Sequence, residues 1–221
     1  MPDFKNAKMS HQLTFVGAWP TSVAFVDENR LAAGNRDGQL YIWDLEREAV
    51  PLSEAQKKNS DLKDRAANVH PVRQLQGHTN GITHLLTAND GQTLGSSRLD
   101  HTIHLWDTAA PATGKSNAVL DVAQRRRQIK RDRSNEAEVL SQPGIEIETQ
   151  PSLHTLNGHK DWVQGCALSD DQRRLLTGDD AGHVKLWDFS SRKEIKSWQG
   201  HPLDGVVSVE VSPDGAKAFV A

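Results

Sequence analysis

The sequence predicts an all-β fold assembled from repeats of a four-stranded unit. Two observations lead to this prediction. The dipeptides Gly-His and Trp-Asp recur at a fixed interval, since His78 precedes Trp106 by 28 positions and His159 precedes Trp187 by the same 28. Short alternating apolar segments lie between them, separated by turn residues, and this pattern is typical of strands joined by tight turns. Because each copy of such a repeat forms one supersecondary unit, the repeat decides the fold.

The composition of the chain limits its possible functions. The chain has 221 residues, a formal net charge of −3 and a single cysteine, Cys166. The net charge provides no overall positive field for nucleic acid. One cysteine excludes an internal disulfide and a cysteine zinc cluster. No segment approaches the ~20 apolar residues of a membrane-spanning helix, and the N-terminus lacks the apolar region of a signal peptide. We therefore expect a cytoplasmic protein that binds neither membranes nor nucleic acid.

Four units align along the chain. They cover residues 11–76, 77–157, 158–198 and 200–221, and the fourth ends before any Trp-Asp pair. Four strands are expected in each complete unit, with turn residues such as Asp-Gly between them. Alternating apolar residues share one face of each third strand: Leu40 and Ile42, Ile103 and Leu105, Val184 and Leu186. Residues 1–221 are thus predicted to be one repeat domain.

The dipeptides and their period together resemble the WD40 family. His159 and His201 are 42 positions apart, and WD40 repeats of about this length form the blades of a β-propeller. The resemblance implies a hydrogen-bonded chain of His, Ser or Thr, Asp and Trp inside each blade. A buried polar chain is tolerable only when every member is satisfied, which would explain why the spacing is fixed while other residues vary.

The resemblance assigns the members of this chain by position. The matching residues are His78, Ser96, Asp100 and Trp106 in unit two, His159, Thr177 and Trp187 in unit three, and Asp37 and Trp43 in unit one. In unit three Ala181 stands at the aspartate position, so Asp179 or Asp180 would have to replace it. Unit one has Ala33 in place of serine and no Gly-His pair. We expect unit two, with all four members, to be the best-ordered blade, and all these residues to be structural.

The units do not make up a complete propeller. Propellers typically close with 4–8 blades, whereas this chain supplies three full units, one truncated unit and a leading strand, "HQLTF". The leading strand resembles the fourth strand of a preceding blade. We expect an open arc or a fragment, with closure by a second chain as the alternative. The exposed β-edges of an arc favour self-association.

Two segments interrupt the spacing and are predicted to be loop insertions, at 46–71 and 109–151. Their composition favours helix or disorder, with Asn117 as a possible helix N-cap. Removal of residues 115–150 is expected to leave the blades folded. The basic run at 125–133, "RRRQIKRDR", contains no aromatic residue that would stack on bases. It is interpreted as a solvated helix or disordered loop, with a protein-docking element and a nucleic-acid contact as alternatives.

A search for catalytic chemistry finds no motif that carries it. His101 and His104 have H-x-x-H spacing, but they flank a turn and a strand, and no further metal ligand is implied. Cys166 occupies an ordinary first-strand position and is expected to be a buried thiol. Nucleophile-elbow, phosphate-loop and dinucleotide-binding motifs are absent from the sequence. We expect no enzyme activity, no cofactor and no metal.

The function expected from the resemblance is a non-catalytic scaffold for protein–protein contacts. Partners of the family often bind the face that carries the Gly-His loops. The candidates on that face are Trp162, Arg98, Asp179 and Arg36. Trp162 is the leading candidate because exposed tryptophans often anchor interfaces, although packing between blades is the alternative. A second hypothesis is a regulatory or substrate-docking segment of a larger enzyme or sensor. A propeller with its own catalytic pocket is a weaker third one.

Overall fold

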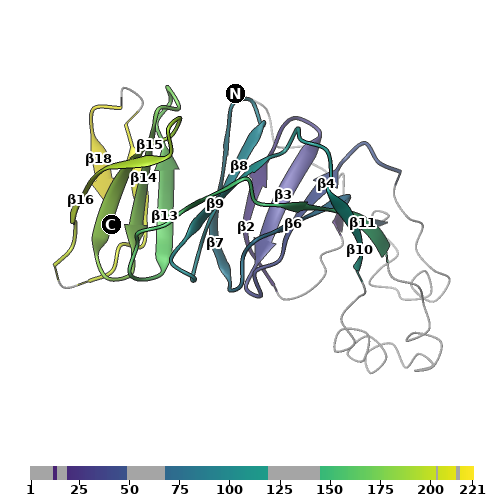
Figure 1. The fold of residues 1–221 in the computed structure, drawn as a ribbon, viewed down its shortest axis with the longest axis horizontal. Helices are drawn as coiled ribbons and strands as arrows, with labels where there is room; N and C mark the ends of the chain where they lie inside the picture. Colours follow the sequence, from purple (N-terminus) through teal and green to yellow (C-terminus); the bar gives the residue numbers. More distant parts are fainter. Residues whose placement is uncertain (1–11, 14–18, 49–67, 119–144, 203, 213–214) are drawn as a thin grey trace, which may run out of the picture.

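The computed structural model describes residues 12–13, 19–48, 68–118, 145–202, 204–212 and 215–221. Within these ranges every regular element is a β-strand, which confirms the all-β prediction (Figure 1). The strands form three large sheets, a two-stranded sheet that continues the series, and a short parallel pair. No helix in the described ranges is long and apolar enough to cross a membrane.

Blade one contains the strands of the first repeat. These are β2 (Pro20–Phe25), β3 (Arg30–Asn35), β4 (Leu40–Asp44) and β6 (Arg73–Gln76). Each is antiparallel to the next, so β2 lies at one edge of the set and β6 at the other. The sequence between β2 and β3 contains Asp27 and Asn29, and the Asp27 carboxylate accepts the N–H groups of Asn29 and Arg30 at 2.9 and 2.7 Å to close the turn. The four strands therefore follow the predicted order.

The other blades repeat this arrangement. Blade two consists of β7 (Ile82–Ala88), β8 (Thr93–Arg98), β9 (Ile103–Asp107) and β12 (His154–Leu156). Blade three consists of β13 (Val163–Leu168), β14 (Arg174–Asp179), β15 (His183–Asp188) and β16 (Lys193–Gln199). Blade four is the pair β17 (Val209–Val211) and β18 (Ala218–Val220). Neighbours within each blade are antiparallel.

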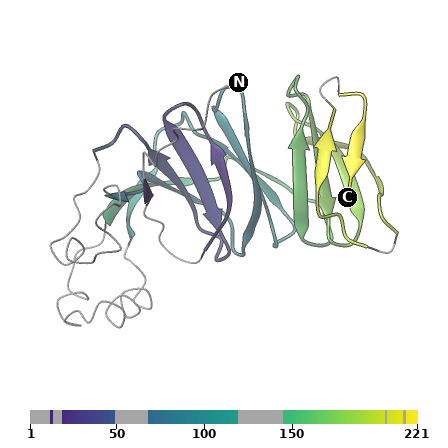
Figure 2. The same cartoon turned by 180° about the vertical axis from the view of Figure 1, so that it is seen from behind.

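The blades stand side by side in an open arc. Figures 1 and 2 show blade one at one end and blade four at the other, with the remaining two between them. The first strands contact each other in sequence, β2 with β7, β7 with β13 and β13 with β17. The fold is therefore a series of propeller-like blades that does not close into a ring.

The core lies between the blades. One apolar cluster joins Leu40 of blade one to Ile82 and Trp106 of blade two, and another joins Leu105 of blade two to Trp187 of blade three. This packing needs a small residue near the end of each second strand.

Two glycines show the close approach of the next blade. A Cβ on Gly34 would lie 2.7 Å from Cγ2 of Ile82, and a Cβ on Gly178 would lie 2.2 Å from Cγ1 of Val206. Ser97 occupies the same position in blade two. Each blade therefore buries its faces only against its neighbours, as in other repeat folds.

The insertion at 109–151 is not entirely a loop. Its ends form β10 (Gly114–Ala118) and β11 (Ile145–Pro151), an antiparallel hairpin. β11 pairs in parallel with β6 and so widens blade one to six strands. The proposed helix N-cap, Asn117, instead lies in β10 opposite Glu146, so that prediction is wrong.

The hairpin also contributes to the core. Ile147 on β11 is buried with Tyr41 and Trp43 of β4. Deletion of residues 115–150 would therefore remove a side chain that packs with Tyr41 and Trp43. That the blades stay folded without these residues stays a prediction. The segment "IEIETQ" alternates apolar and polar residues, which is the strand pattern that the helix-favouring composition of the whole insertion obscured. The basic run at 125–133 and most of the insertion at 46–71 lie outside the described residues.

The leading strand is placed differently from the prediction. β1 (Gln12–Leu13) pairs in parallel with β5 (Asn68–Val69). Leu13 packs against the cluster that contains Tyr41, Trp43 and Ile147. The strand therefore adjoins blade one through β5, in the chain that leads into β6. The residue boundaries of the four repeats stay predictions.

Candidate functional site

Blade three contains a complete buried chain of hydrogen bonds. Asp179 Oδ2 lies 2.8 Å from His159 Nδ1, and His159 Nε2 lies 2.6 Å from Thr177 Oγ1. Trp187 Nε1 donates to the same threonine oxygen at 2.8 Å. All four residues are buried. The chain therefore fixes the Gly-His loop to the second and third strands, as the family resemblance implies.

The direction of each hydrogen bond in this chain follows from the chemistry of its end members. The indole N–H can only donate and an ionised carboxylate can only accept. Thr177 therefore donates its hydroxyl proton to His159 Nε2, and His159 donates its Nδ1–H to Asp179. Burial lowers the pKa of His159, partly opposed by the Asp179 carboxylate. Burial alone would raise the pKa of Asp179, but hydrogen bonds from His159 and the His183 N–H outweigh it and the pKa lies below 3.8.

Asp179 replaces the aspartate that the family pattern places at position 181. It lies at the end of β14, two positions before Ala181, and its Oδ1 also accepts the His183 N–H at 2.9 Å. Asp180, the other candidate, is exposed. One buried carboxylate thus serves both the histidine and the tight turn. Asp179 is 1% exposed, so its prediction as a protein-binding residue is wrong.

Blade two has all four residues, but the chain between them is incomplete. His78 Nε2 contacts Ser96 Oγ, whereas His78 Nδ1 lies 3.5 Å from Asp100 Oδ2. Trp106 Nε1 is buried and has no hydrogen-bond partner among the described residues. The premise that only unit two has the complete polar chain is therefore wrong, because blade three has it. That unit two is the best-ordered blade stays a prediction.

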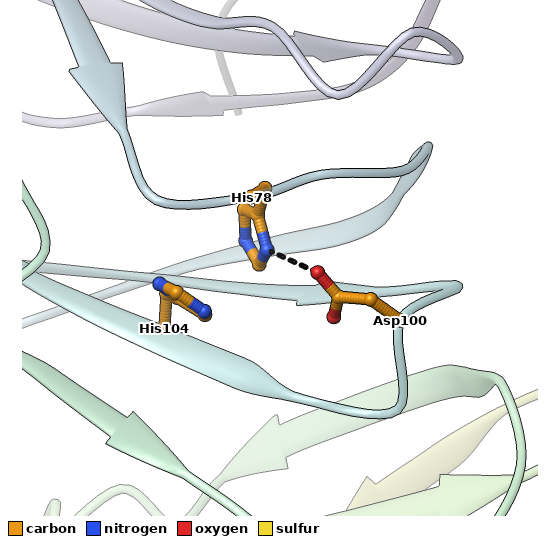
Figure 3. A group of neighbouring side chains, drawn as sticks. All are labelled: His78, Asp100 and His104. Atoms are coloured by element: carbon orange, nitrogen blue, oxygen red, sulfur yellow. Dashed lines mark ion pairs between the residues drawn. The ribbon is translucent and has the colours of Figure 1, made fainter.

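Two neighbouring side chains, His104 and Arg98, distinguish the chain of blade two from that of blade three. The His104 ring is tilted against His78 and stacked on Trp106, with ring centroids 4.2 and 5.6 Å away (Figure 3 shows the two histidines with Asp100). Arg98 Nη1 lies 3.2 Å from Asp100 Oδ2 and competes with His78 for the carboxylate. Sequence matching identified the four family positions but gave no weight to these two adjacent side chains.

The side chain of Arg98 is fully buried, so its prediction as a partner-binding residue is wrong. It lies against the turn of blade one, where a Cβ on Gly38 would lie 2.1 Å from its Nη2. Burial lowers the pKa of Arg98 to about 10, partly opposed by Asp100. The guanidinium is therefore part of the contact between blades one and two.

Blade one does not form the chain. Asp37 is exposed, so its assignment as a structural member is wrong. Asn35 holds the turn instead, because its Oδ1 accepts the N–H groups of Asp37 and Gln39 at 3.0 and 2.8 Å. Trp43 is buried as predicted, with Tyr41 in edge-on contact at 6.1 Å between ring centroids. Packing of aromatic rings replaces the polar chain in this blade.

Two tryptophans are exposed at equivalent positions of blades one and three. Trp162 is 44% exposed and Trp19 is 86% exposed. The carbonyl of each accepts an N–H from the second turn of its own blade, Trp162 from Asp180 at 2.9 Å and Trp19 from Arg36 at 3.4 Å. In blade two Gly81 accepts the N–H of Leu99 in the same way, at 3.1 Å.

These residues define one face, which we call the loop face: Trp19, Arg36, Gly81, Trp162 and Asp180. Arg36 is exposed as predicted. Its turn packs against blade two, since a Cβ on Gly81 would lie 2.7 Å from the Arg36 carbonyl oxygen. Trp19 was missed at the sequence level. Alignment of "AWPTSVAF" with "DWVQGCAL" would have found it, because both tryptophans directly precede a first strand.

Comparisons with known proteins agree with this geometry. The profile of the family "WD domain, G-beta repeat" matches residues 10–44, 69–107 and 150–188, about half of the chain. The chain belongs to the WD40 family. The three matched segments contain β2 to β4, β7 to β9 and β13 to β15.

Several curated WD40 proteins are similar to the chain. It is 30% identical over 112 residues to Cross-pathway control WD-repeat protein 2 of Flammulina velutipes, covering 47% of this chain and 30% of that protein. It is 27% identical over 183 residues to human THO complex subunit 6, covering 76% and 49%. It is 26% identical over 185 residues to the ribosome biogenesis protein WDR12 homolog of Culex quinquefasciatus, covering 75% and 40%. The chain thus spans half or less of the length of these relatives.

The cysteine and the H-x-x-H pair of this WD40 chain do not form a reactive site. Cys166 is buried, and burial raises the pKa of its thiol to about 12, which disfavours the reactive thiolate at neutral pH. His101 lies in the turn between β8 and β9 at a φ of 69° and does not join His104. His104 instead lies beside His78 and Asp100. Spacing along the sequence could not show this, because His78 comes from a different loop.

Proposed function

We propose that this WD40 chain is a non-catalytic scaffold that binds protein partners on its loop face. The observation that carries the proposal is the exposure of Trp19 and Trp162 at equivalent positions of that face. Large exposed aromatic side chains are favoured anchors of protein interfaces, because they bury much apolar area on binding. WD40 repeats in general mediate protein–protein contacts, and THO complex subunit 6 is by its name a subunit of a complex.

The rigidity of the blades supports the same proposal. The chain Asp179–His159–Thr177–Trp187 fixes the loop that presents Trp162. The carbonyl of Trp162 is itself bonded to the second turn. A loop backbone held in this way loses little conformational freedom on binding, and so more of the contact energy of Trp162 appears as affinity.

Affinity capture from an extract of the source cells tests the proposal. The immobilised chain is compared with the double variant W19A/W162A and with I195A. Ile195 is a matched control, since it is 48% exposed but lies on β16 and not on the loop face. Loss of the captured proteins in the double variant alone supports the loop face, whereas equal capture by all three chains contradicts it.

We propose a cytoplasmic location as well. Its support is the single buried cysteine, which suits a reducing compartment. Fluorescence microscopy of a fusion protein tests this, and an exclusively nuclear or organellar signal would contradict it.

A further inference from the structure

Three potential metal ligands converge in blade two. His78 comes from the loop before β7, Asp100 from the turn between β8 and β9, and His104 from β9 (Figure 3). One ligand atom of each residue lies within 4.8 Å of the other two. Figure 3 shows both imidazole rings and the carboxylate gathered around one region. Two imidazoles and a carboxylate are a donor set typical of Zn²⁺.

Within the part of the chain that the structure describes, a nitrogen of each histidine is buried without a hydrogen-bond partner, whereas the Asp100 side chain is 18% exposed. Asp100 Oδ1 accepts hydrogen bonds from the N–H and the hydroxyl of Thr102, so Oδ2 is the oxygen left for an ion. His104 is 8% exposed, and its Nδ1 has no hydrogen-bond partner among the described residues. The same is true of His78 Nδ1, which has only the 3.5 Å approach to Asp100. Buried polar atoms without partners are costly, and a bound ion is one explanation for them. His78 Nε2 contacts Ser96, which resembles the outer hydrogen bond that orients a metal-binding histidine.

Blade three provides an internal comparison. Lys185 occupies the place of His104, since each precedes the blade tryptophan by two positions. Its Nζ pairs with Glu194 at 2.7 Å, and the histidine of that blade is fully satisfied by Asp179 and Thr177. Within the described residues, only the group in blade two has three such ligands together.

We propose that His78, Asp100 and His104 bind one divalent transition-metal ion of the Zn²⁺ type, with water as the remaining ligand. The ion would connect the Gly-His loop to β9 and the second turn. It would thus stabilise blade two where the hydrogen-bond chain is incomplete. Arg98 opposes the site, because its Nη1 lies 3.2 Å from Asp100 Oδ2 and its charge repels a cation. The ion therefore has to share the carboxylate with the guanidinium, and we expect Zn²⁺ affinity below that of a site without this charge.

Titration of the metal-free 221-residue chain tests the proposal. Zn²⁺ affinity is measured by competition with a chromophoric chelator, and Co²⁺ is added separately to record ligand-field absorption. The variant H104K replaces the imidazole by the residue that blade three has at this position, although β12 offers no counterpart of the Glu194 that pairs with Lys185. The variant H101N is the control, because it removes a neighbouring histidine outside the group, and asparagine tolerates the positive φ of that position. Circular dichroism verifies that each variant keeps its β-structure.

The expected result is one Zn²⁺ per chain in the wild type and in H101N. In H104K the affinity should fall by more than the roughly 10–100-fold that loss of an outer-shell partner costs. The Co²⁺ spectrum of the wild type should show the intense visible bands of a low-coordinate site, absent from H104K. Equal Zn²⁺ binding by the wild type and a folded H104K would overturn the proposal, and so would absence of stoichiometric binding by the wild type. If H104K does not fold, the decision rests on the wild-type stoichiometry and its Co²⁺ bands.

Discussion

Asp179 is the buried carboxylate of the hydrogen-bond chain in blade three. It accepts hydrogen bonds from His159 and from the His183 N–H while 1% exposed. Asp179→Ala would leave His159 Nδ1 buried without a partner, and an unsatisfied buried group costs about 1–3 kcal/mol. We expect the free energy of unfolding, measured with urea, to fall by that amount.

Two further variants serve as comparisons for Asp179→Ala. Asp180→Ala removes an exposed neighbour and should change the free energy of unfolding by no more than about 0.5 kcal/mol. Asp100→Ala in metal-free protein should also lower the free energy of unfolding, because it removes the carboxylate 3.2 Å from the buried Arg98 guanidinium and leaves that charge uncompensated. An Asp100→Ala variant as stable as the wild type would show that this pair does not stabilise blade two.

Blade three should make the free energy of unfolding depend on pH. Burial lowers the pKa of His159 below its ordinary 6.5, and its hydrogen bonds hold the pKa of Asp179 below 3.8. The unfolded chain therefore binds more protons at both sites, and stability increases with pH. We expect the free energy of unfolding to be highest above pH 6.5 and to decrease as the pH falls below it, then again below pH 3.8. In His159→Gln the decrease between pH 7 and pH 5 should be smaller, and an unchanged slope would refute the assignment.

The role of a residue could be predicted where its distance along the sequence from the Trp-Asp pair defines that role. His159, Thr177 and Trp187 could be placed because the family positions are fixed relative to Trp-Asp. Asp37 and Arg98 could not, because exposure depends on the neighbouring blade. Asn35 and Trp19 were missed for the same kind of reason. A turn can be held by any short polar side chain, and Trp19 becomes visible only when the segments before the first strands of blades one and three are aligned.

At the level of elements, the hairpin β10–β11 is the feature that separates the structure from the prediction. Ala118 of β10 is paired with Ile145 of β11, so the two residues that flank 119–144 lie side by side. An Asn-Gly pair forms the two-residue turns that suit such a hairpin. Replacement of residues 119–144 by Asn-Gly should therefore keep the thermal unfolding midpoint unchanged, as followed by circular dichroism. A large decrease in the midpoint would mean that these residues support the blades.

Ile147 should be the sensitive position of the same hairpin. It is 2% exposed and packs with Tyr41 and Trp43. Ile147→Ala removes buried apolar volume, which costs about 2–5 kcal/mol. Denaturant unfolding measures this loss, with Glu146→Ala as the control because Glu146 is an exposed neighbour on β11. If both variants are equally stable, β11 is not part of the core of blade one.

The strands of the four units could be predicted because alternating apolar residues and turn residues are local signals. β11 carries the same alternation but was assigned to an insertion of mixed composition. Parallel pairing of β11 with β6 could not be predicted, since it joins segments 75 residues apart, such as Arg73 and Glu148. The ion pair between these two side chains, at 2.8 Å, is likewise a consequence of the fold and not a sequence signal.

At the level of the whole molecule, the open arc leaves apolar residues exposed at both ends. On β2, Ala24 packs toward blade two, and alternation directs Val23 and Phe25, each 61% exposed, to the opposite side. At the other end Val207 and Phe219 of blade four are 71% and 68% exposed. Unpaired edges and apolar faces favour association. We expect the average mass in sedimentation velocity to increase with protein concentration.

A charge at one end should weaken this association. Phe219 lies on β18, the last strand of the arc, and Phe219→Lys places a charge on that edge. The variant should remain monomeric at concentrations where the wild type associates. A wild type that stays monomeric throughout the range would show that the ends of the arc are protected in solution.

The central claim is that the blades hold a protein-binding face that carries Trp162. The most direct test is the dissociation constant of a captured partner, measured by calorimetry for the wild type, W162A and I195A. Loss of a central anchor costs about 2 kcal/mol or more, which is roughly a 30-fold weaker dissociation constant. The account predicts that W162A shows such a loss while I195A binds like the wild type. Equal affinity of W162A and the wild type, or an equal loss in I195A, would contradict it.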